Sequence, residues 1–229
     1  MIFALVAGGR PAGNTVAAAA DLLSGARDAG ASTDLRFVTP AIVQPIGDCA
    51  PCVERGECQI DDGFDAIMER VYAADCLVLG TPLYWYGPSA QLKAFVDRWS
   101  CLLDLEEERF RARMRGKRAA LLLAQGERGF YEAAPALQML EWSLRYLDMP
   151  LAGRIVVVGH TRSDYRGDRA QRDQVRGAGT EIAAGRTVDL LPPWFHLRHE
   201  PGAPLGGIYS PRSSDREVTV HEAPVLEHE

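Results

Sequence analysis

The sequence predicts a doubly wound α/β domain built on a five-stranded parallel sheet. Short apolar runs alternate with longer segments of helical spacing, and a glycine-rich loop follows the first apolar run. Such alternation is typical of βαβ units, whose crossovers are right-handed. Five strands that are each followed by one helix favour the strand order 2-1-3-4-5, which is the flavodoxin-like order, over a six-stranded dinucleotide fold.

The five expected strands are short and rich in apolar residues. The first is a continuous apolar run, as in strands that are buried on both faces of a sheet. The second alternates between polar and apolar residues. The expected strands cover residues 2–7, 33–38, 76–80, 117–124 and 154–158.

The five expected helices follow these strands. In the first four, apolar residues recur three or four positions apart, which places them on one helix face. Asp62 is expected to cap the second helix, and Pro88 suits the first turn of the third. The last helix is more polar and is interrupted by glycines. The expected helices cover residues 14–30, 64–71, 88–103, 131–147 and 166–187.

Two segments depart from this alternation. Residues 39–62 form a long irregular stretch with three cysteines, and loops of that length in compact domains are usually functional. Residues 188–229 hold 6 of the 14 prolines and no periodic pattern, so we expect a domain over residues 1–187 followed by a C-terminal extension. Residues 190–195 are mostly apolar, and exposed apolar patches mark interfaces. We therefore predict that the extension is an arm of a dimer.

Composition excludes several classes of protein. The 229 residues carry 25 Lys and Arg against 31 Asp and Glu, a net charge of −6, whereas nucleic-acid binders usually present a basic stripe. No apolar run approaches the roughly 18–20 residues of a membrane span, and the N-terminus lacks the features of a signal peptide. We expect a cytoplasmic protein with no nucleic-acid or membrane partner, whose five cysteines form no disulfide framework.

The loop after the first expected strand has the composition of an anion site. Gly9 and Gly13 let backbone amides converge, and the next helix points its positive end at the same place. Asn14 and Thr15 add side-chain donors, and Arg10 adds a charged contact. A nucleotide P-loop would have lysine where Asn14 stands, so a single phosphate monoester is the better-matched ligand. A glycine-rich turn without a ligand is the alternative.

Two further loops lie at the carboxyl ends of expected strands, where ligands of doubly wound sheets bind. The segment PLYWYG forms an apolar ledge for a planar heteroaromatic ring. Core packing is the alternative, but three successive aromatic side chains cannot all enter one core. The segment QGE after the fourth strand adds polar groups and a glycine, although it can also be an ordinary solvated loop. The predicted ring-contacting residues are Pro82, Leu83, Tyr84, Trp85, Tyr86, Gly87, Gln125, Gly126 and Glu127.

Together these motifs resemble those of the NAD(P)H-dependent FMN reductases of the flavodoxin-like superfamily. GGRPAGNT, TPLYWYGPSAQLKAFVDRW and CAPCVERGECQIDD carry the resemblance, which runs from residue 1 to about 187. The chain is most similar to the branch that includes iron-sulfur flavoproteins. The resemblance implies that residues 9–15 hold the FMN phosphate and that residues 82–87 and 125–127 flank the isoalloxazine.

The resemblance also implies the activity. FMN supplies the redox chemistry, so we expect hydride from NAD(P)H and electron transfer to a small-molecule acceptor such as a quinone, a nitro compound or free flavin. No Ser/His/Asp or Cys/His arrangement indicates a nucleophile, and no catalytic side chain is predicted. The alternatives are an electron carrier without its own turnover, like flavodoxins or iron-sulfur flavoproteins, and a nucleotide hydrolase. We expect a homodimer or a homotetramer.

Three cysteines, Cys49, Cys52 and Cys58, match the cysteine region of this family. A [4Fe–4S] cluster takes four thiolates and a structural zinc ion takes four ligands, whereas only three thiols lie together in the sequence. We therefore predict a packed loop without a metal or cluster. Cys76, on an expected strand, and Cys101, on an expected helix, are predicted to be ordinary core residues.

Overall fold

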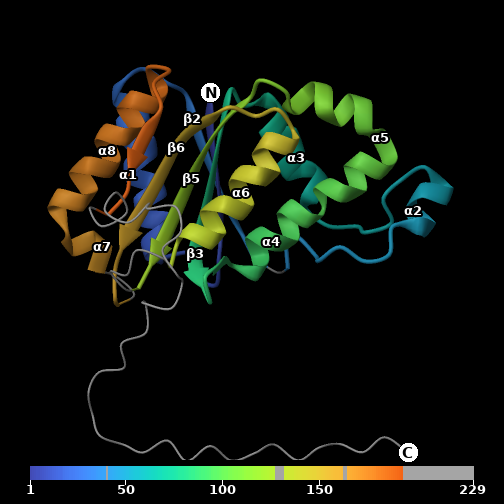
Figure 1. Cartoon of the computed structure of the whole chain (residues 1–229), viewed down its shortest axis with the longest axis horizontal. Coiled ribbons are helices and arrows are strands. Elements are labelled where there is room, and N and C mark those ends of the chain that lie inside the picture. Colours follow the sequence, from blue (N-terminus) through green and yellow to red (C-terminus); the bar gives the residue numbers. More distant parts are fainter. Residues whose placement is uncertain (40, 127–131, 162–163, 193–229) are drawn as a thin grey trace, which may run out of the picture. The chain divides into compact units, whose positions relative to one another are not determined.

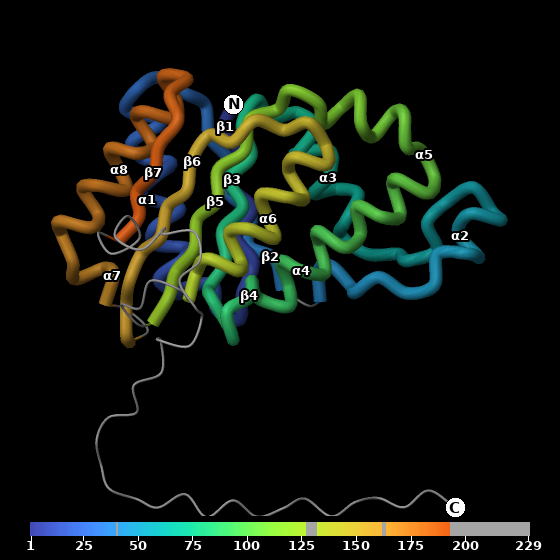
Figure 2. Tube along the Cα trace, in the orientation of Figure 1, coloured from blue at the N-terminus to red at the C-terminus, as the bar shows by residue number. Residues whose placement is uncertain are grey.

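A computed structural model describes residues 1–39, 41–126, 132–161 and 164–192 of the chain. In this part, a seven-stranded sheet is covered by helices on both faces (Figures 1 and 2). Six strands are parallel in the order β2-β1-β3-β5-β6-β7, and β4 pairs antiparallel with β3. The strands are β1 (Ile2–Ala7), β2 (Thr33–Val38), β3 (Cys76–Tyr84), β4 (Gly87–Pro88), β5 (Arg118–Gln125), β6 (Leu151–Val158) and β7 (Val188–Leu190).

The helices form two layers. One face of the sheet carries α1, α7 and α8, and the other carries α3, α4, α5 and α6, with α2 packed on α5 (Figure 1). The helices are α1 (Asn14–Asp28), α2 (Ala50–Arg55), α3 (Phe64–Ala73), α4 (Ala90–Asp97), α5 (Trp99–Met114), α6 (Ala134–Tyr146), α7 (Asp164–Gly167) and α8 (Arg169–Ala183). None of the helices in the described residues is long and apolar enough to cross a membrane.

Strand β1 shows why the central strands are apolar throughout. Its side chains alternate between two cores, and all six of its residues are buried. Phe3 and Leu5 belong to the core under α3–α6, whereas Ala4 and Val6 belong to the core under α1 and α8. A parallel sheet that is covered on both faces needs this continuous apolar pattern.

Helices α1 and α8 approach each other closely at two glycines. A Cβ atom at Gly25 would lie 1.8 Å from the carbonyl oxygen of Arg176, and one at Gly179 would lie 1.9 Å from that of Leu22. No side chain fits in these places. The glycines that make α8 a weak helix in the sequence therefore permit its packing on α1.

The α/β class predicted from the sequence is confirmed, but the predicted number of five strands is wrong. Strand β7 extends the sheet beyond β6, and β4 forms a hairpin with the end of β3. Both are too short to show a period, and Asp189 in the middle of β7 interrupts its apolar character. Its carboxylate pairs instead with Arg154 on β6 at 3.0 Å. The predicted extension from residue 193 onward lies outside the described residues.

The helix expected over residues 88–103 is in fact two helices, α4 and α5. Pro88 is not in a first helical turn but in β4, and Ser89 is the N-cap of α4, with its Oγ accepting the Leu92 N–H at 3.3 Å. Asp62 does not occupy the N-cap of α3, which is Gly63, although its Oδ1 accepts the Phe64 N–H at 2.9 Å. The expected irregular stretch after β2 contains the short helix α2.

Candidate functional site

The carboxyl ends of β1, β3, β5 and β6 meet at one edge of the sheet around a cavity of about 260 Å³. This is the edge at which doubly wound sheets bind ligands, and the volume is near the lower end for small-molecule sites. The lining includes no Asp or Glu among the described residues. It comprises Val6, Ala7, Gly8, Gly9, Arg10, Gly13, Asn14, Thr15, Val16, Phe37, Pro82, Leu83, Tyr84, Ala124, Gln125, Gly126, Gly159, His160 and Thr161.

The first loop provides the polar end of the cavity. All five residues predicted to bind phosphate are in its lining: Gly9, Arg10, Gly13, Asn14 and Thr15. The Gly13 N–H donates to the Arg10 carbonyl at 3.4 Å, which folds the loop into a turn. Helix α1 begins directly afterwards, and the first N–H groups of a helix have no partner within it. This arrangement, with an exposed arginine beside it, suits an anion.

Asn14 connects the loop after β1 to the loop after β6. Its Nδ2 donates to the Thr161 carbonyl at 2.9 Å, and a Cβ on Gly159 would lie 2.5 Å from the same nitrogen. Its Oδ1 is buried and has no hydrogen-bond partner among the described residues. An unpaired buried acceptor is costly, so the cavity suits a ligand that brings a hydroxyl donor to this atom. The sequence predicted only a phosphate-binding role for Asn14.

A small hydrogen-bond network fixes the start of the next loop. Ser89 Oγ donates to the Ala7 carbonyl at 2.9 Å, and the Ser89 N–H donates to Thr81 Oγ1 at 2.8 Å. Both side chains are fully buried. Gly8 lies against Pro82 so closely that a Cβ would be 2.9 Å from the proline Cδ. The loops after β1 and β3 therefore keep a fixed separation, a role for Thr81 and Ser89 that the sequence did not reveal.

The aromatic segment divides between the cavity and solvent. Pro82, Leu83 and Tyr84 line the cavity. Trp85 and Tyr86 form the turn of the β3–β4 hairpin, with φ values of 48° and 64°, and 94% of Trp85 is exposed. Together with Gly87 they lie outside the lining, so the structure brings only part of the predicted ledge to the cavity.

The ends of β5 and β6 complete the cavity wall. Gln125 and Gly126, which were predicted to contact the ring, line this wall, whereas Glu127 lies outside the described residues. The Gln125 carbonyl accepts the Gly159 N–H at 2.9 Å, which joins the two strand ends. Sequence reasoning missed the lining residues that follow β6, His160 and Thr161. Their position directly after an expected strand was a usable signal, because the loops after the first, third and fourth expected strands were predicted to form the site on the same ground.

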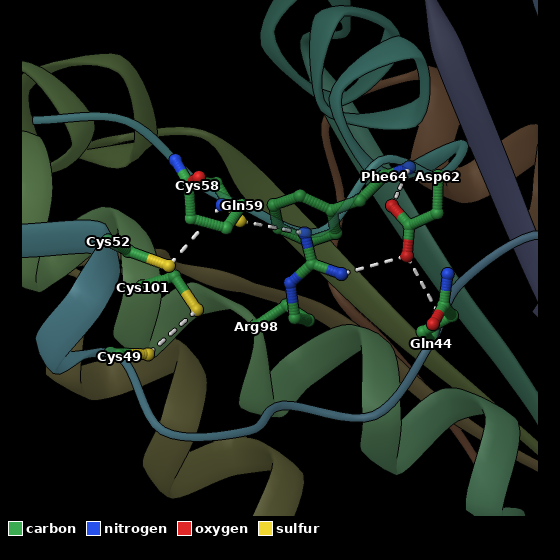
Figure 3. Close-up of polar contacts among 9 residues, drawn as sticks. All are labelled: Gln44, Cys49, Cys52, Cys58, Gln59, Asp62, Phe64, Arg98 and Cys101. Atoms are coloured by element: carbon green, nitrogen blue, oxygen red, sulfur yellow. Dashed lines mark hydrogen bonds and ion pairs between the residues drawn. The ribbon is translucent and has the colours of Figure 1, made fainter. Parts of the chain in front are cut away.

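The three motif cysteines lie near a fourth thiol that comes from α5. Cys49 Sγ is 3.2 Å from Cys101 Sγ (Figure 3). Cys101 is 2% exposed, and burial, followed by its contact with Cys49, raises its pKa to about 12. The sequence predicted Cys101 to be buried but gave no sign of this contact, because 52 positions separate the two residues.

Within the described residues, these thiols are not arranged like the ligand set of an iron-sulfur cluster. No three His, Cys, Asp or Glu side chains within the described ranges converge as metal ligands do. Cys52 Sγ instead accepts the Gln59 N–H at 3.3 Å, and Cys58 Sγ accepts from Arg98 Nη2 at 3.4 Å. Thiolates on different irons of a cluster are also farther apart than two sulfur atoms in contact.

Comparison with known proteins places this architecture among flavoproteins. A flavodoxin, WrbA-like protein from Agrobacterium tumefaciens has a similar fold, with a TM-score of 0.54 and 19% identity over 80% of this chain and 95% of that one. The NAD(P)H-dependent FMN-containing oxidoreductase YwqN of Bacillus subtilis is 30% identical over 72% of this chain and 88% of its own length. The iron-sulfur flavoprotein MJ1083 of Methanocaldococcus jannaschii is 36% identical over 39% of this chain and 46% of its own length.

The family model for NADPH-dependent FMN reductases matches residues 1–174, and the chain belongs to this family. The predicted family, the enzyme class of NAD(P)H-dependent FMN oxidoreductases, and the cofactors FMN and NAD(P)H are thereby confirmed. The cavity is chemically compatible with FMN: it combines a loop whose donors suit an anion with the buried acceptor Asn14 Oδ1, and FMN carries both a phosphate and hydroxyl groups.

Proposed function

We propose that the cavity holds FMN and that the enzyme passes electrons from NAD(P)H to a small, planar two-electron acceptor, with quinones as the leading class. Nitro compounds and free flavin are the other two candidate acceptors. The observation that carries the proposal is the single cavity shared by the first loop, the start of the PLYWYG segment and the end of β5.

The phosphate end of the ligand is assigned to the first loop. Thr15 is 5% exposed, and its hydroxyl group can donate a hydrogen bond to the phosphate. The backbone amides at the start of α1 are further, uncharged donors, and Arg10 adds positive charge. Because no carboxylate is among the described lining residues, nothing there opposes a dianionic phosphate. Asn14 Oδ1 would accept a ribityl hydroxyl, while Asn14 Nδ2 keeps the loop after β6 in place.

The ring end is assigned to the loops after β3 and β5. Pro82, Leu83 and Tyr84 present an apolar wall, and Gln125 and Gly126 face it from the neighbouring strand. Trp85, Tyr86, Gly87 and Glu127 are proposed to flank the ring as well. Bound FMN would supply the two-electron chemistry. The chain's part is to orient the ring and to leave room on the aromatic side for a second planar molecule, which is why a quinone suits the site.

The proposal extends to the location and assembly of the enzyme. We propose a cytoplasmic homodimer or homotetramer. Of the predicted extension over residues 188–229, the part that follows β7 would act as the arm. This rests on the absence of a membrane-spanning helix from the described residues and on the apolar character of residues 190–195.

The test is a turnover assay on the purified full-length chain. FMN should be bound in a one-to-one ratio, and NADH or NADPH should be oxidised with a benzoquinone, a nitroaromatic compound and free FMN offered in parallel. Parallel lines in double-reciprocal plots would indicate the expected ping-pong scheme. Thr15→Val should weaken FMN binding, whereas the exposed matched control Thr187→Val should not. Failure to bind FMN would overturn the proposal.

An electron carrier is the second candidate, because several relatives are iron-sulfur flavoproteins. A carrier would bind FMN tightly and be reduced, but it would show no multiple turnover with any of the small acceptors. Rapid turnover with a quinone excludes this candidate. Tight FMN binding without turnover would support it.

A further inference from the structure

A pair of thiols remote in sequence meets on the face of the sheet that carries α3–α6. Cys49 directly precedes α2, and Cys101 lies in the first turn of α5. Their sulfur atoms are 3.2 Å apart, and a dashed line in Figure 3 marks this contact. Neither residue lines the cavity. The proposed function therefore makes no use of this contact.

The other two thiols nearby have different partners. Cys52 Sγ faces the backbone N–H of Gln59, and Cys58 Sγ faces the guanidinium of Arg98. Because no set of three metal ligands forms in the described parts of the chain, the geometry selects one pair of thiols rather than a four-thiol site.

We propose that Cys49 and Cys101 are a redox-active dithiol that closes to a disulfide on oxidation by a hydroperoxide and thereby fastens the segment around α2 to α5. Cytosolic disulfides are usually of this reversible kind. The bond would join two elements that already pack against each other, so it requires little movement of the backbone.

The two cysteines differ in access, and this sets the order of events. Cys49 is half-buried and can meet a hydroperoxide, whereas Cys101 is 2% exposed. The Cys49 thiolate attacks the peroxide, the O–O bond breaks, and one water leaves with a proton, so Cys49 becomes a sulfenic acid. Cys101 then attacks that sulfur, the S–O bond breaks, and its thiol proton leaves with hydroxide as a second water. Two thiols and one hydrogen peroxide thus give one disulfide and two waters.

The consequence is a covalent crosslink between two distant parts of the chain. A disulfide stabilises a fold mainly by restricting the unfolded chain, and more so for long closed loops. The thermal midpoint should therefore rise on oxidation. FMN binding should stay unchanged, because the dithiol is not part of the cavity lining. The dithiol and the FMN-dependent function can therefore fail independently of each other in an experiment.

The experiment treats the purified full-length protein with stoichiometric hydrogen peroxide and then counts free thiols by alkylation. The count should fall from five to three, a peptide pair linking Cys49 with Cys101 should appear by mass spectrometry, and the thermal midpoint should rise. Dithiothreitol should reverse all three changes.

Three variants sharpen the test. Cys49→Ser, at the accessible position, should abolish the crosslink and the rise of the midpoint, and Cys76→Ser, a thiol outside the pair, should retain both. Cys101→Ser should accumulate a sulfenic acid at Cys49 that dimedone captures. The proposal is overturned if five thiols remain, if Cys52 and Cys58 form the crosslink instead, or if the reduced protein holds stoichiometric iron or zinc that blocks alkylation.

Discussion

Arg98 Nη1 donates to Asp62 Oδ2 at 2.8 Å, and both side chains are almost completely buried, with exposed fractions of 1% and 3% (Figure 3). Asp62 also accepts the backbone N–H groups of Gln44 and Phe64, at 2.8 and 2.9 Å. The guanidinium lies 4.5 Å from the centre of the Phe64 ring. Although burial disfavours its charge, Asp62 raises the pKa of Arg98 above its ordinary value. One carboxylate therefore joins the segment after β2 to α3 and to the α4–α5 junction.

Removing one member of this pair should be costly, because it leaves a buried charge without its partner. We expect Asp62→Ala to lower the free energy of unfolding by about 3–5 kcal/mol, as measured by urea denaturation. The double variant Asp62→Ala/Arg98→Met should lose less than the sum of the single losses. The exposed pair Lys93–Asp97 is the control, and Lys93→Met should cost about 1 kcal/mol or less. A similarly small loss for Asp62→Ala would contradict the structural role.

Arg10 should discriminate a phosphorylated flavin from an unphosphorylated one. We expect Arg10→Ala to weaken FMN binding by about tenfold, which corresponds to ~1.4 kcal/mol for a charge-assisted contact. Riboflavin binding should be unaffected because riboflavin has no phosphate. Fluorescence titration with both flavins measures this difference. Arg169→Ala, at a position whose side chain is 94% exposed, is the matched control. Equal weakening for both flavins would place Arg10 away from the phosphate.

Two glycines two positions apart on α8 should respond oppositely to alanine. At Gly179 the new Cβ would lie 1.9 Å from the Leu22 carbonyl oxygen, whereas at Gly177 nothing lies within 4 Å. Gly177→Ala should stabilise the protein by up to about 1 kcal/mol through helix propensity. Gly179→Ala should destabilise it, because α1 and α8 must separate. Thermal unfolding of both variants checks the prediction, and equal midpoints would refute the close contact.

The hairpin turn at Trp85 and Tyr86 should store strain. Both residues have positive φ, which two-residue turns of type I′ require and which Asn-Gly adopts more easily. We expect Trp85→Asn/Tyr86→Gly to raise stability by about 1–2 kcal/mol and to weaken FMN binding if these rings flank the isoalloxazine. Asp148→Gly relieves a positive φ of 54° away from the cavity and should leave FMN binding unchanged. If the hairpin variant binds FMN as tightly as the unchanged chain, neither the Trp85 ring nor the Tyr86 ring contacts FMN.

Cys76 should make stability depend on alkaline pH. Burial on β3 raises the pKa of its thiol from 9.0 to about 11. The folded chain favours the neutral thiol. Its contribution to the free energy of unfolding is therefore fully present below pH 9 and is lost as the pH rises toward 11. The full loss is about 2–3 kcal/mol. We expect the thermal midpoint of Cys76→Ala to fall less steeply than that of the unchanged chain across this window. If the midpoints of both proteins fall in parallel with pH, the raised pKa of Cys76 is contradicted.

Much of the candidate site follows from one rule that sequence alone supplies. Residues at the carboxyl ends of the apolar strands of a parallel sheet lie at one edge. For this reason the cavity is lined by Gly9, Arg10, Gly13, Asn14, Thr15, Pro82, Leu83, Tyr84, Gln125 and Gly126. The same rule would have found His160. It could not show that Tyr84 lines the cavity whereas Trp85 does not, because the chain turns back directly after Tyr84. A two-residue turn without glycine or asparagine cannot be recognised from its sequence.

By itself the sequence determined the alternation of strands and helices, the two-sided burial of the sheet and the three loops of the cavity. These properties depend on spacing along the chain, which sets the faces of each helix and strand. Only the tertiary structure decided that Arg98 meets Asp62, that Cys101 meets Cys49 and that Gly179 touches α1. Such contacts join segments tens of residues apart. They depend on how the helices pack against the sheet, and the spacing of residues along the chain does not predict that packing.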